Sequence, residues 1–243
     1  MVAVFVHGVP ETPSVWEPLV GALERTDVAL LQLPGFGCPL PDAFEPTMHR
    51  YADWLAEELR AFDEVDLVSH DWGAILTLRV LADRPANVRS WATDMGDLDD
   101  SFRWHDTARI WQTPGEGEAL IDAMVGAGPD DKAALLQGVG VPADHAPEMA
   151  RHLDRTMGEA ILGLYRSAVD VGREWGPGID SIEAPGLVVE SGKDPFRSPG
   201  RARRLAERTG AEILELPEVG HFWMLEEPSA VAAALTRFWV AVG

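Results

Sequence analysis

Cysteine is almost absent from this sequence: Cys38 is the only one, so no disulfide can form within the chain. A fold built for an oxidising compartment is therefore not expected. No apolar run approaches the ~18 residues that a membrane span needs. The apolar residues 2–6 lack the basic flank of a signal peptide. We expect a cytoplasmic protein in which Cys38 is an unreactive loop residue.

Basic residues are scarce: 20 Lys and Arg stand against 40 Asp and Glu, a formal net charge of -20. Such an excess disfavours nucleic acids and anionic membranes, for which basic patches supply most of the affinity. A length of 243 residues with 46% hydrophobic side chains suits one large domain with a buried core. We expect a small molecule as the partner, and oligomeric state leaves no signal in the sequence.

Strand and helix patterns alternate along most of the chain. Short apolar runs rich in β-branched residues predict strands, and apolar residues at helical spacing predict helices between them. The expected strands are 2–7, 28–33, 65–68, 88–92, 187–190 and 212–216, and the expected helices are 14–25, 47–62, 72–82, 200–209 and 229–242. This alternation predicts an α/β fold whose mostly parallel sheet is flanked by helices.

The alternation stops after the fourth predicted strand. Residues 97–178 show helical stretches separated by glycine and proline breaks at 113–115 and 176–178, without a clear strand. We expect a short helical lid at 97–178, inserted into a core domain made of residues 1–96 and 179–243. Ligands of parallel sheets bind at the carboxyl ends of the strands, so the lid should cover the site.

The segment Ser-His-Asp-Trp-Gly at 69–73 follows a predicted strand and opens a predicted helix. This is the layout of the nucleophile elbow of Gly-x-Ser-x-Gly hydrolases, a tight turn that exposes its middle side chain. Here the middle residue is Asp71. The alternative is that Asp71 only caps the following helix, since Asp is a preferred N-cap residue.

Together with other segments, this turn resembles the epoxide hydrolase and haloalkane dehalogenase branch of the α/β-hydrolase superfamily, over essentially the whole chain. The further matching segments are His-Gly-Val-Pro-Glu at 7–11, Leu-Pro-Gly-Phe-Gly at 33–37, Glu-Ser-Gly-Lys-Asp-Pro at 190–195, Val-Gly-His-Phe at 219–222 and Glu-Pro at 227–228. The resemblance implies an α/β-hydrolase fold with an aspartate nucleophile.

The resemblance also implies a role for each matching residue. Asp71 would be the nucleophile, His221 the general base and Asp194 the acid that orients it. The backbone N–H groups of Val9 and Trp72 would form the oxyanion hole. Two alternatives for the acid stay open: Asp94 after the preceding strand could orient the histidine, and Asp194 could serve only an Asx-turn before Pro195. His221 itself could be a loop residue that caps a helix.

Epoxide hydrolases generally place two tyrosines in the lid, and here the sequence departs from its relatives. The chain has two tyrosines in total, and Tyr51 falls in a predicted core helix. Tyr165 resembles the second lid tyrosine and would donate a proton to the substrate, although it could also simply pack. The counterpart of the first is missing or replaced.

An aspartate nucleophile points to substitution at saturated carbon. A serine would form an ether there, whereas a carboxylate forms an ester that water can cleave. His221, with an ordinary pKa near ~6.5, suits the activation of that water. We therefore expect an enzyme that opens an epoxide to a diol. The alternatives are a haloalkane dehalogenase, which often has Asn where Val9 stands, a non-catalytic binder, and a biosynthetic enzyme for one complex epoxide.

Trp104, His105, Trp111 and Trp175 are expected to line the inner face of the lid, where such residues are more often core than ligand contacts. The candidates for substrate binding are Trp104, His105, Trp111 and Phe222. Neither a metal nor a cofactor is expected. The acidic run at 94–100 lacks the spacing of a calcium loop, and no His/Cys cluster suggests zinc. The glycines at 35 and 37 lack the phosphate-binding pattern.

Overall fold

The computed structural model describes residues 1–94, 98–196 and 200–243. Within them, six strands form one fully parallel sheet in the order β2-β1-β3-β4-β5-β6. Their bounds are β1 Val2–Val6, β2 Val28–Leu31, β3 Val65–Ser69, β4 Val88–Thr93, β5 Gly186–Ser191 and β6 Glu212–Leu216. The expected α/β fold with a parallel sheet is confirmed. The strand ends lie within two residues of the expected ones.

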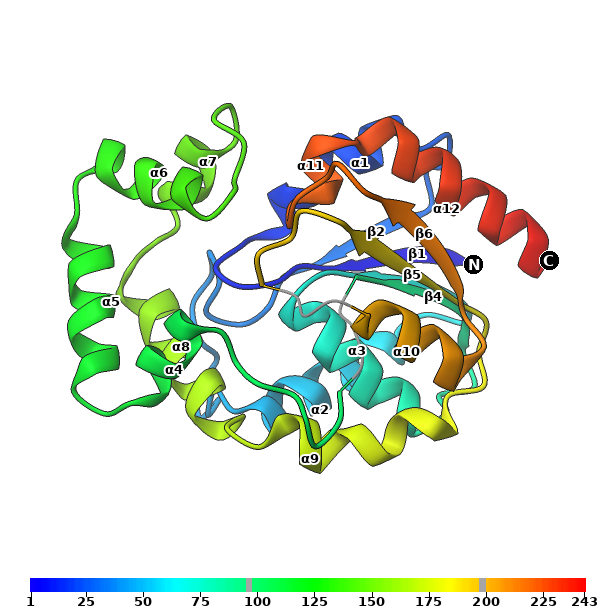
Figure 1. The fold of residues 1–243 in the computed structure, drawn as a ribbon, viewed down its shortest axis with the longest axis horizontal. Helices are drawn as coiled ribbons and strands as arrows, with labels where there is room; N and C mark the ends of the chain where they lie inside the picture. Colours follow the sequence, from blue (N-terminus) through cyan, green and yellow to red (C-terminus); the bar gives the residue numbers. More distant parts are fainter. Residues whose placement is uncertain (95–97, 197–199) are drawn as a thin grey trace.

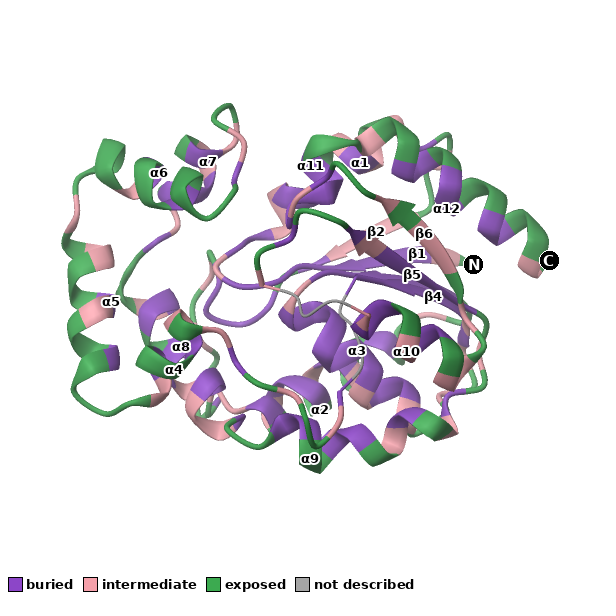
Figure 2. Cartoon of the chain, viewed as in Figure 1, coloured by how far each residue is buried: buried purple, intermediate pink, exposed green. Residues whose placement is uncertain are grey.

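Helices cover both faces of the sheet (Figure 1). One face carries α1 Glu17–Ala22, α11 Trp223–Glu226 and α12 Pro228–Val242, and the other carries α2 Met48–Leu59, α3 Trp72–Ala82 and α10 Arg201–Thr209. Because both faces are covered, every residue of β3 is buried, which explains why the strands read as continuous apolar runs. Figure 2 shows the central strands buried between helices whose outer sides are exposed, whereas β2 and β6 are less buried.

Two helices differ from the expected ones. The helix expected over 14–25 is a 3-10 turn, Pro13–Trp16, followed by the short α1, which stops where Leu23 becomes extended. Helix α11 was not predicted, since four residues are too few to show a periodicity.

In the described part of 98–181, helices joined by loops are present and no strand. They are α4 Asp106–Gln112, α5 Glu116–Gly126, α6 Pro129–Gly138, α7 Ala146–Ala150, α8 Arg155–Ser167, α9 Val171–Trp175 and the 3-10 helix η2 Gly176–Ser181. Helices α4 to α8 lie beyond the carboxyl ends of the strands (Figure 1). At the expected break, 176–178, the α-helix α9 ends and the 3-10 helix η2 follows directly, with Pro177 in its first turn, where a missing N–H costs no hydrogen bond. The expected boundary at 96/97 lies outside the described residues, and the division into core and lid stays a prediction.

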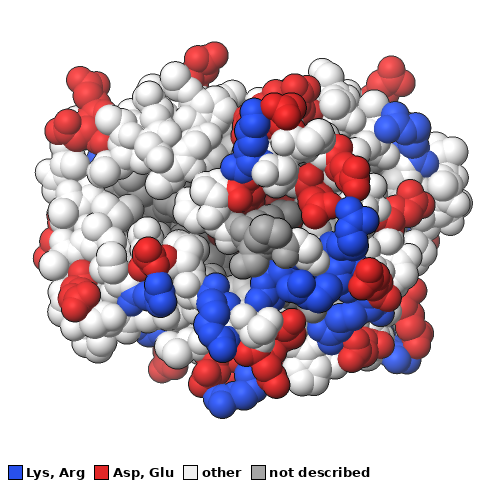
Figure 3. All heavy atoms as spheres, in the orientation of Figure 1, with Lys and Arg blue, Asp and Glu red and all other residues white. Residues whose placement is uncertain are grey.

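Basic side chains gather over α10 on the face in Figure 3. Arg203 contacts Glu215 at 3.2 Å and Arg208 contacts Asp180 at 2.7 Å, so acidic neighbours offset the charge of this helix. That the chain binds no nucleic acid stays a prediction. Among the described helices, none has the length and apolar character needed to cross a membrane.

Candidate active site

Asp71 lies at the tight turn between β3 and α3. Its backbone has φ 49° and ψ -118°, a conformation that residues other than glycine rarely adopt and that costs free energy. The turn packs closely against its surroundings. A Cβ atom on Gly73 would lie 2.4 Å from the backbone oxygen of Val6, and one on Gly8 would lie 2.4 Å from the Cβ atom of Asp71. Glycine is therefore required at both positions.

The Asp71 carboxylate does not cap α3, although the residue occupies the N-cap position. Its Oδ1 atom instead accepts a hydrogen bond of 3.0 Å from the backbone N–H of Val9. The Trp72 N–H starts the helix and so has no acceptor within it. Burial raises the pKa of Asp71, and the neighbouring His221 and His70 oppose that shift only in part. The structure thus brings Val9, Asp71 and Trp72 together as expected for an oxyanion hole.

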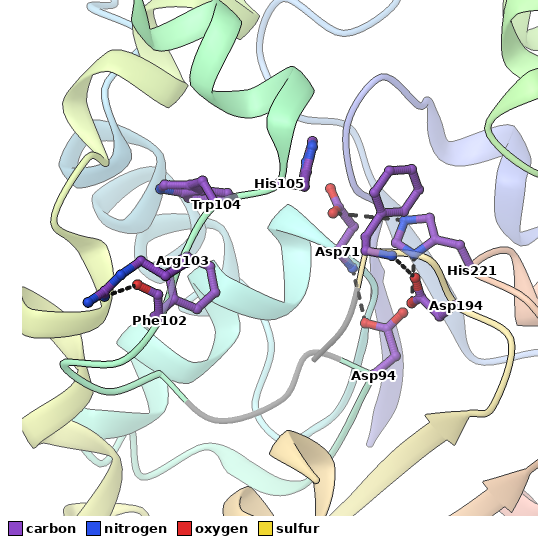
Figure 4. Close-up of a pocket in the computed structure, with 9 residues that line it drawn as sticks. Asp71, Asp94, Phe102, Arg103, Trp104, His105, Asp194 and His221 are labelled. Atoms are coloured by element: carbon purple, nitrogen blue, oxygen red, sulfur yellow. Dashed lines mark hydrogen bonds and ion pairs between the residues drawn. The ribbon is translucent and has the colours of Figure 1, made fainter. Parts of the chain in front are cut away.

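His221 faces Asp194, which follows β5. The His221 Nδ1 atom lies 2.9 Å from Asp194 Oδ2, and both side chains are buried. The other Asp194 oxygen accepts the N–H of Phe196 at 2.8 Å, so the expected Asx-turn also forms. On its other side, His221 Nε2 lies 3.9 Å from Asp71 Oδ2. Figure 4 shows the imidazole between the two carboxylates.

Asp94, the alternative acid, contacts the turn at Asp71. Its Oδ1 atom accepts the backbone N–H of Asp71 at 3.1 Å, and its Oδ2 atom accepts the Trp223 indole N–H at 2.8 Å. Oδ2 also pairs with Nδ1 of His70. Because His221 Nδ1 already faces Asp194, these contacts favour Asp194 as the orienting acid. Asp94 instead contacts His70, Trp223 and the backbone of Asp71.

Tyr165 lies on α8 and lines a cavity together with Asp71. Its side chain is buried, and its ring meets the Trp72 ring edge-on at 5.3 Å. Burial raises the pKa of the Tyr165 phenol well above 10, and Asp71 acts in the same direction. The phenol therefore keeps its proton at any ordinary pH and can donate it in a hydrogen bond.

A cavity of about 320 Å³ opens beside Asp71, Tyr165 and His221. Trp111 and Phe222 line it, as expected from the sequence. The remainder is mostly apolar and comes largely from helices α5 and α6 and from nearby loops, including Leu120, Met124, Leu135, Leu136, Val139 and Leu153. An apolar cavity with few polar groups at one end is typical of a small-molecule site.

His105 lines both this cavity and a smaller one of about 30 Å³ that also contains Asp71 and His221. It is the N-cap of α4, and its Nδ1 atom accepts the N–H of Ala108 at 3.2 Å. Burial lowers the pKa of His105 to about 4, and His221 acts in the same direction. The ring is therefore neutral near pH 7 with its proton on Nε2, because Nδ1 is an acceptor.

Two other expected lid contacts fall differently. Trp104 lines the smaller cavity, where its ring stacks on Trp72 at 5.3 Å. Trp175 lines neither cavity, so that expectation is wrong. It is buried in α9, with its ring 5.8 Å from that of His49 on α2, because α9 follows the core helices and does not cover the site.

Sequence reasoning gave no role to Glu11 and His70, both fully buried at this site. Glu11 accepts the N–H of Gly8 at 2.8 Å, and its other oxygen lies 2.9 Å from His70 Nε2. Burial favours the neutral carboxyl and would raise the pKa of Glu11, but the charge and hydrogen bond of His70, together with His7 and His221, outweigh it and hold that pKa below 4.5. The available signal was the acidic Glu11, which follows Pro10 shortly after an apolar strand, but its partner His70 is distant in sequence.

Glu11, His70 and His221 have potential metal-ligand atoms within 4.8 Å of one another, the one such group among the described residues. The chemistry of this group does not suit a cation. Both ring nitrogens of His70 face carboxylate oxygens, so each carries a proton and neither has a free lone pair.

Comparisons with known proteins agree with this architecture. Haloalkane dehalogenase DbeA from Bradyrhizobium elkani USDA94 is 23% identical with a TM-score of 0.76, covering 99% of this chain and 91% of that one. An E-2-(acetamidomethylene)succinate hydrolase is 20% identical with a TM-score of 0.74, covering 98% of this chain and 90% of that one. A lipase-esterase related protein from Clostridium acetobutylicum ATCC 824 is 17% identical with a TM-score of 0.74, covering 98% and 93%.

At these identities the structural likeness shows the fold alone. No curated protein matches the sequence significantly. The pattern of the alpha/beta hydrolase family, in contrast, matches residues 3–234, nearly the whole chain. The chain therefore belongs to the alpha/beta hydrolase family.

Proposed function

We propose that this protein opens epoxides to diols through a covalent ester on Asp71. The observation that carries the proposal is the pairing, at one end of an apolar cavity, of a carboxylate in a nucleophile elbow with the proton-bearing phenol of Tyr165. A carboxylate is a nucleophile suited to saturated carbon, and an epoxide oxygen needs a proton as its bond to carbon breaks.

In the first step, Asp71 Oδ2 attacks a ring carbon. The carbon–oxygen bond of the epoxide breaks, and the oxygen takes the proton of Tyr165. His105 can assist, since its Nε2–H is a neutral donor in the same cavity. The product is a hydroxyalkyl ester on Asp71 and a tyrosinate.

In the second step, His221 takes a proton from water, and the hydroxide adds to the ester carbonyl of Asp71. Asp194 stabilises the imidazolium. The N–H groups of Val9 and Trp72 stabilise the oxyanion, which collapses and expels the diol with the proton returned by His221. The proton that leaves the regenerated Asp71 carboxyl restores Tyr165 through solvent.

A single turnover in H₂¹⁸O tests the covalent route. We expect the label in the Asp71 carboxylate, found by mass spectrometry of the peptide that contains it, and unlabelled diol from the first turnover. Label in the first diol would mean that water attacks the epoxide directly. Asp71→Ala is the control and should take up no label and form no diol.

A second candidate is haloalkane dehalogenation by the same nucleophile. One observation favours it: the indole Nε1 of Trp111, which lines the cavity, is buried and has no hydrogen-bond partner in the described structure. A departing halide needs N–H donors and no proton. Halide release from small haloalkanes without any opening of epoxides would favour this candidate. Turnover of neither class by folded protein would favour a binding role.

The expected lid, residues 97–178, belongs to this proposal as the part that encloses the substrate. Cytoplasmic location also stays a prediction.

A further inference from the structure

Three buried ionisable residues near Asp71 have no part in the two steps of the proposed reaction. Glu11, His70 and Asp94, here called the buried triad, are each at most 1% exposed. They come from the loop after β1, the turn after β3 and the end of β4. Charged groups this deeply buried cost free energy unless they are paired, so their arrangement calls for a physical reason.

The triad links the two segments that form the oxyanion hole. At one end, Glu11 accepts the N–H of Gly8, the residue before Val9. In the middle, His70 lies between the two carboxylates, with Nε2 2.9 Å from Glu11 and Nδ1 on Asp94. At the other end, Asp94 accepts the backbone N–H of Asp71 at 3.1 Å.

The chain of contacts closes on itself. The N–H of Val9 donates to Asp71 Oδ1 at 3.0 Å, which joins the first end of the triad to the last. The result is a ring of hydrogen bonds and ion pairs in which the distance between the Val9 N–H and the Asp71 carboxylate is set by buried contacts. The Trp223 indole N–H fixes Asp94 from outside the ring.

We infer that Glu11, His70 and Asp94 are positioning residues that hold the Val9 N–H against Asp71 Oδ1 for the ester-hydrolysis step. This inference rests on the proposed function. His70 is an imidazolium in this arrangement, because both of its ring nitrogens face carboxylates. Burial alone would lower the pKa of His70, but Asp94 and Glu11 raise it well above 6.5.

The two steps use the Val9 hydrogen bond differently. Alkylation removes negative charge from Asp71, so a donor on Oδ1 stabilises the starting carboxylate at least as well as the transition state. Ester hydrolysis creates negative charge on this same oxygen, and the donor then lowers the barrier. Displacement of the Val9 N–H should therefore slow the second step selectively.

Glu11→Gln and Asp94→Asn test the inference because both keep the size of the side chain. Gln can still accept the Gly8 N–H, and Asn can still accept the Asp71 N–H, but each presents an uncharged group to His70. Asp66→Asn is the matched control. Asp66 is also a fully buried carboxylate, paired with Arg25 and Arg89 near the start of β3, at the opposite end of that strand from Asp71.

The readout is single-turnover and steady-state kinetics with styrene oxide and other small epoxides, beside thermal unfolding of each variant. We expect both triad variants to slow ester hydrolysis by roughly 10- to 100-fold, less than the ~10²–10³-fold of losing an oxyanion donor outright. Because kcat/KM reports the alkylation step, it should change little while kcat and KM fall together. Asp66→Asn should lower the stability and leave both rates unchanged.

A second measurement uses the unmodified protein and does not depend on turnover. Nitrogen-15 NMR of the histidine side chains, with His70→Gln for assignment, should show both His70 nitrogens protonated at pH 8. A neutral His70 would overturn the inference. So would triad variants that slow both steps equally, or that lose stability like Asp66→Asn without any kinetic effect. Failure of the wild type to form an adduct on Asp71 would instead contradict the proposed function.

Discussion

The Nδ1 atom of His221 lies 2.9 Å from the Oδ2 atom of Asp194, a residue 27 positions earlier in the chain. The two side chains follow neighbouring strands, Asp194 after β5 and His221 after β6. The carboxylate fixes which nitrogen of the imidazole carries a proton, and so leaves Nε2 free to accept one from water. Three predictions concern this site, and a fourth concerns the buried His7.

Asp194→Asn should lower the rate of ester hydrolysis by several powers of ten, since an amide in place of the orienting carboxylate favours the wrong tautomer. Asp94→Asn should cost less, because it leaves the pair between His221 and Asp194 in place. Single-turnover rates of the two variants on one epoxide give the ranking. The reverse order would make Asp94 the orienting acid.

His221→Gln should form the alkyl-enzyme ester but fail to hydrolyse it. Alkylation needs only Asp71 and a proton donor, whereas hydrolysis needs a base. Intact-protein mass spectrometry after substrate addition should show an adduct of the substrate's mass, and peptide mapping should place it on Asp71. An adduct on Ser69 or Cys38 would reassign the nucleophile.

Tyr165→Phe should slow alkylation by roughly 10²–10⁴-fold, the range for loss of a general acid. The loss should be smaller to the extent that His105 shares the role, and Tyr165→Phe combined with His105→Ala should then lose more than either alone. Ester hydrolysis should be nearly unaffected. Tyr51→Phe is the control: Tyr51 is equally buried, but its hydroxyl donates to the Pro34 carbonyl at 2.6 Å, away from the cavity. Equal alkylation rates in Tyr165→Phe and wild type would refute its role as donor.

Stability should fall as the pH drops from about 6.5 toward 4.5. The N–H of Leu33 donates to His7 Nε2, so the buried ring is neutral, and burial lowers the pKa of His7 to about 4. The unfolded state, with an ordinary histidine pKa, binds the proton first and is therefore stabilised relative to the folded state as the pH falls. Complete protonation of His7 would lower the free energy of unfolding by roughly 3 kcal/mol. His70 does not oppose this, because a raised pKa changes stability only above pH 6.5.

Urea unfolding at pH 7, 5.5 and 4.5 checks this prediction. His7→Gln should show a flatter dependence of the free energy of unfolding on pH than the wild type, whatever its absolute stability. Parallel curves for the two proteins would show that another group titrates in this range.

The sequence by itself determined the order of strands and helices and the position of the tight turn at Asp71. Apolar strand runs and helical periodicity are local patterns. The close contact between Gly73 and the backbone of Val6 requires glycine, which is visible in the sequence at that one position. The same holds for the segments around His221 and Asp194, whose turns are read from adjacent residues.

Only the tertiary structure decided which carboxylate faces His221 and what surrounds Asp71. Asp94 and Asp194 both follow strands of one sheet, and the choice between them depends on how neighbouring strand ends project in space. Glu11 and His70 meet across elements distant in sequence, so neither one's neighbours reveal the pair. Ion pairs and cavities depend on distances of a few ångströms between such elements, and local sequence patterns do not encode those distances.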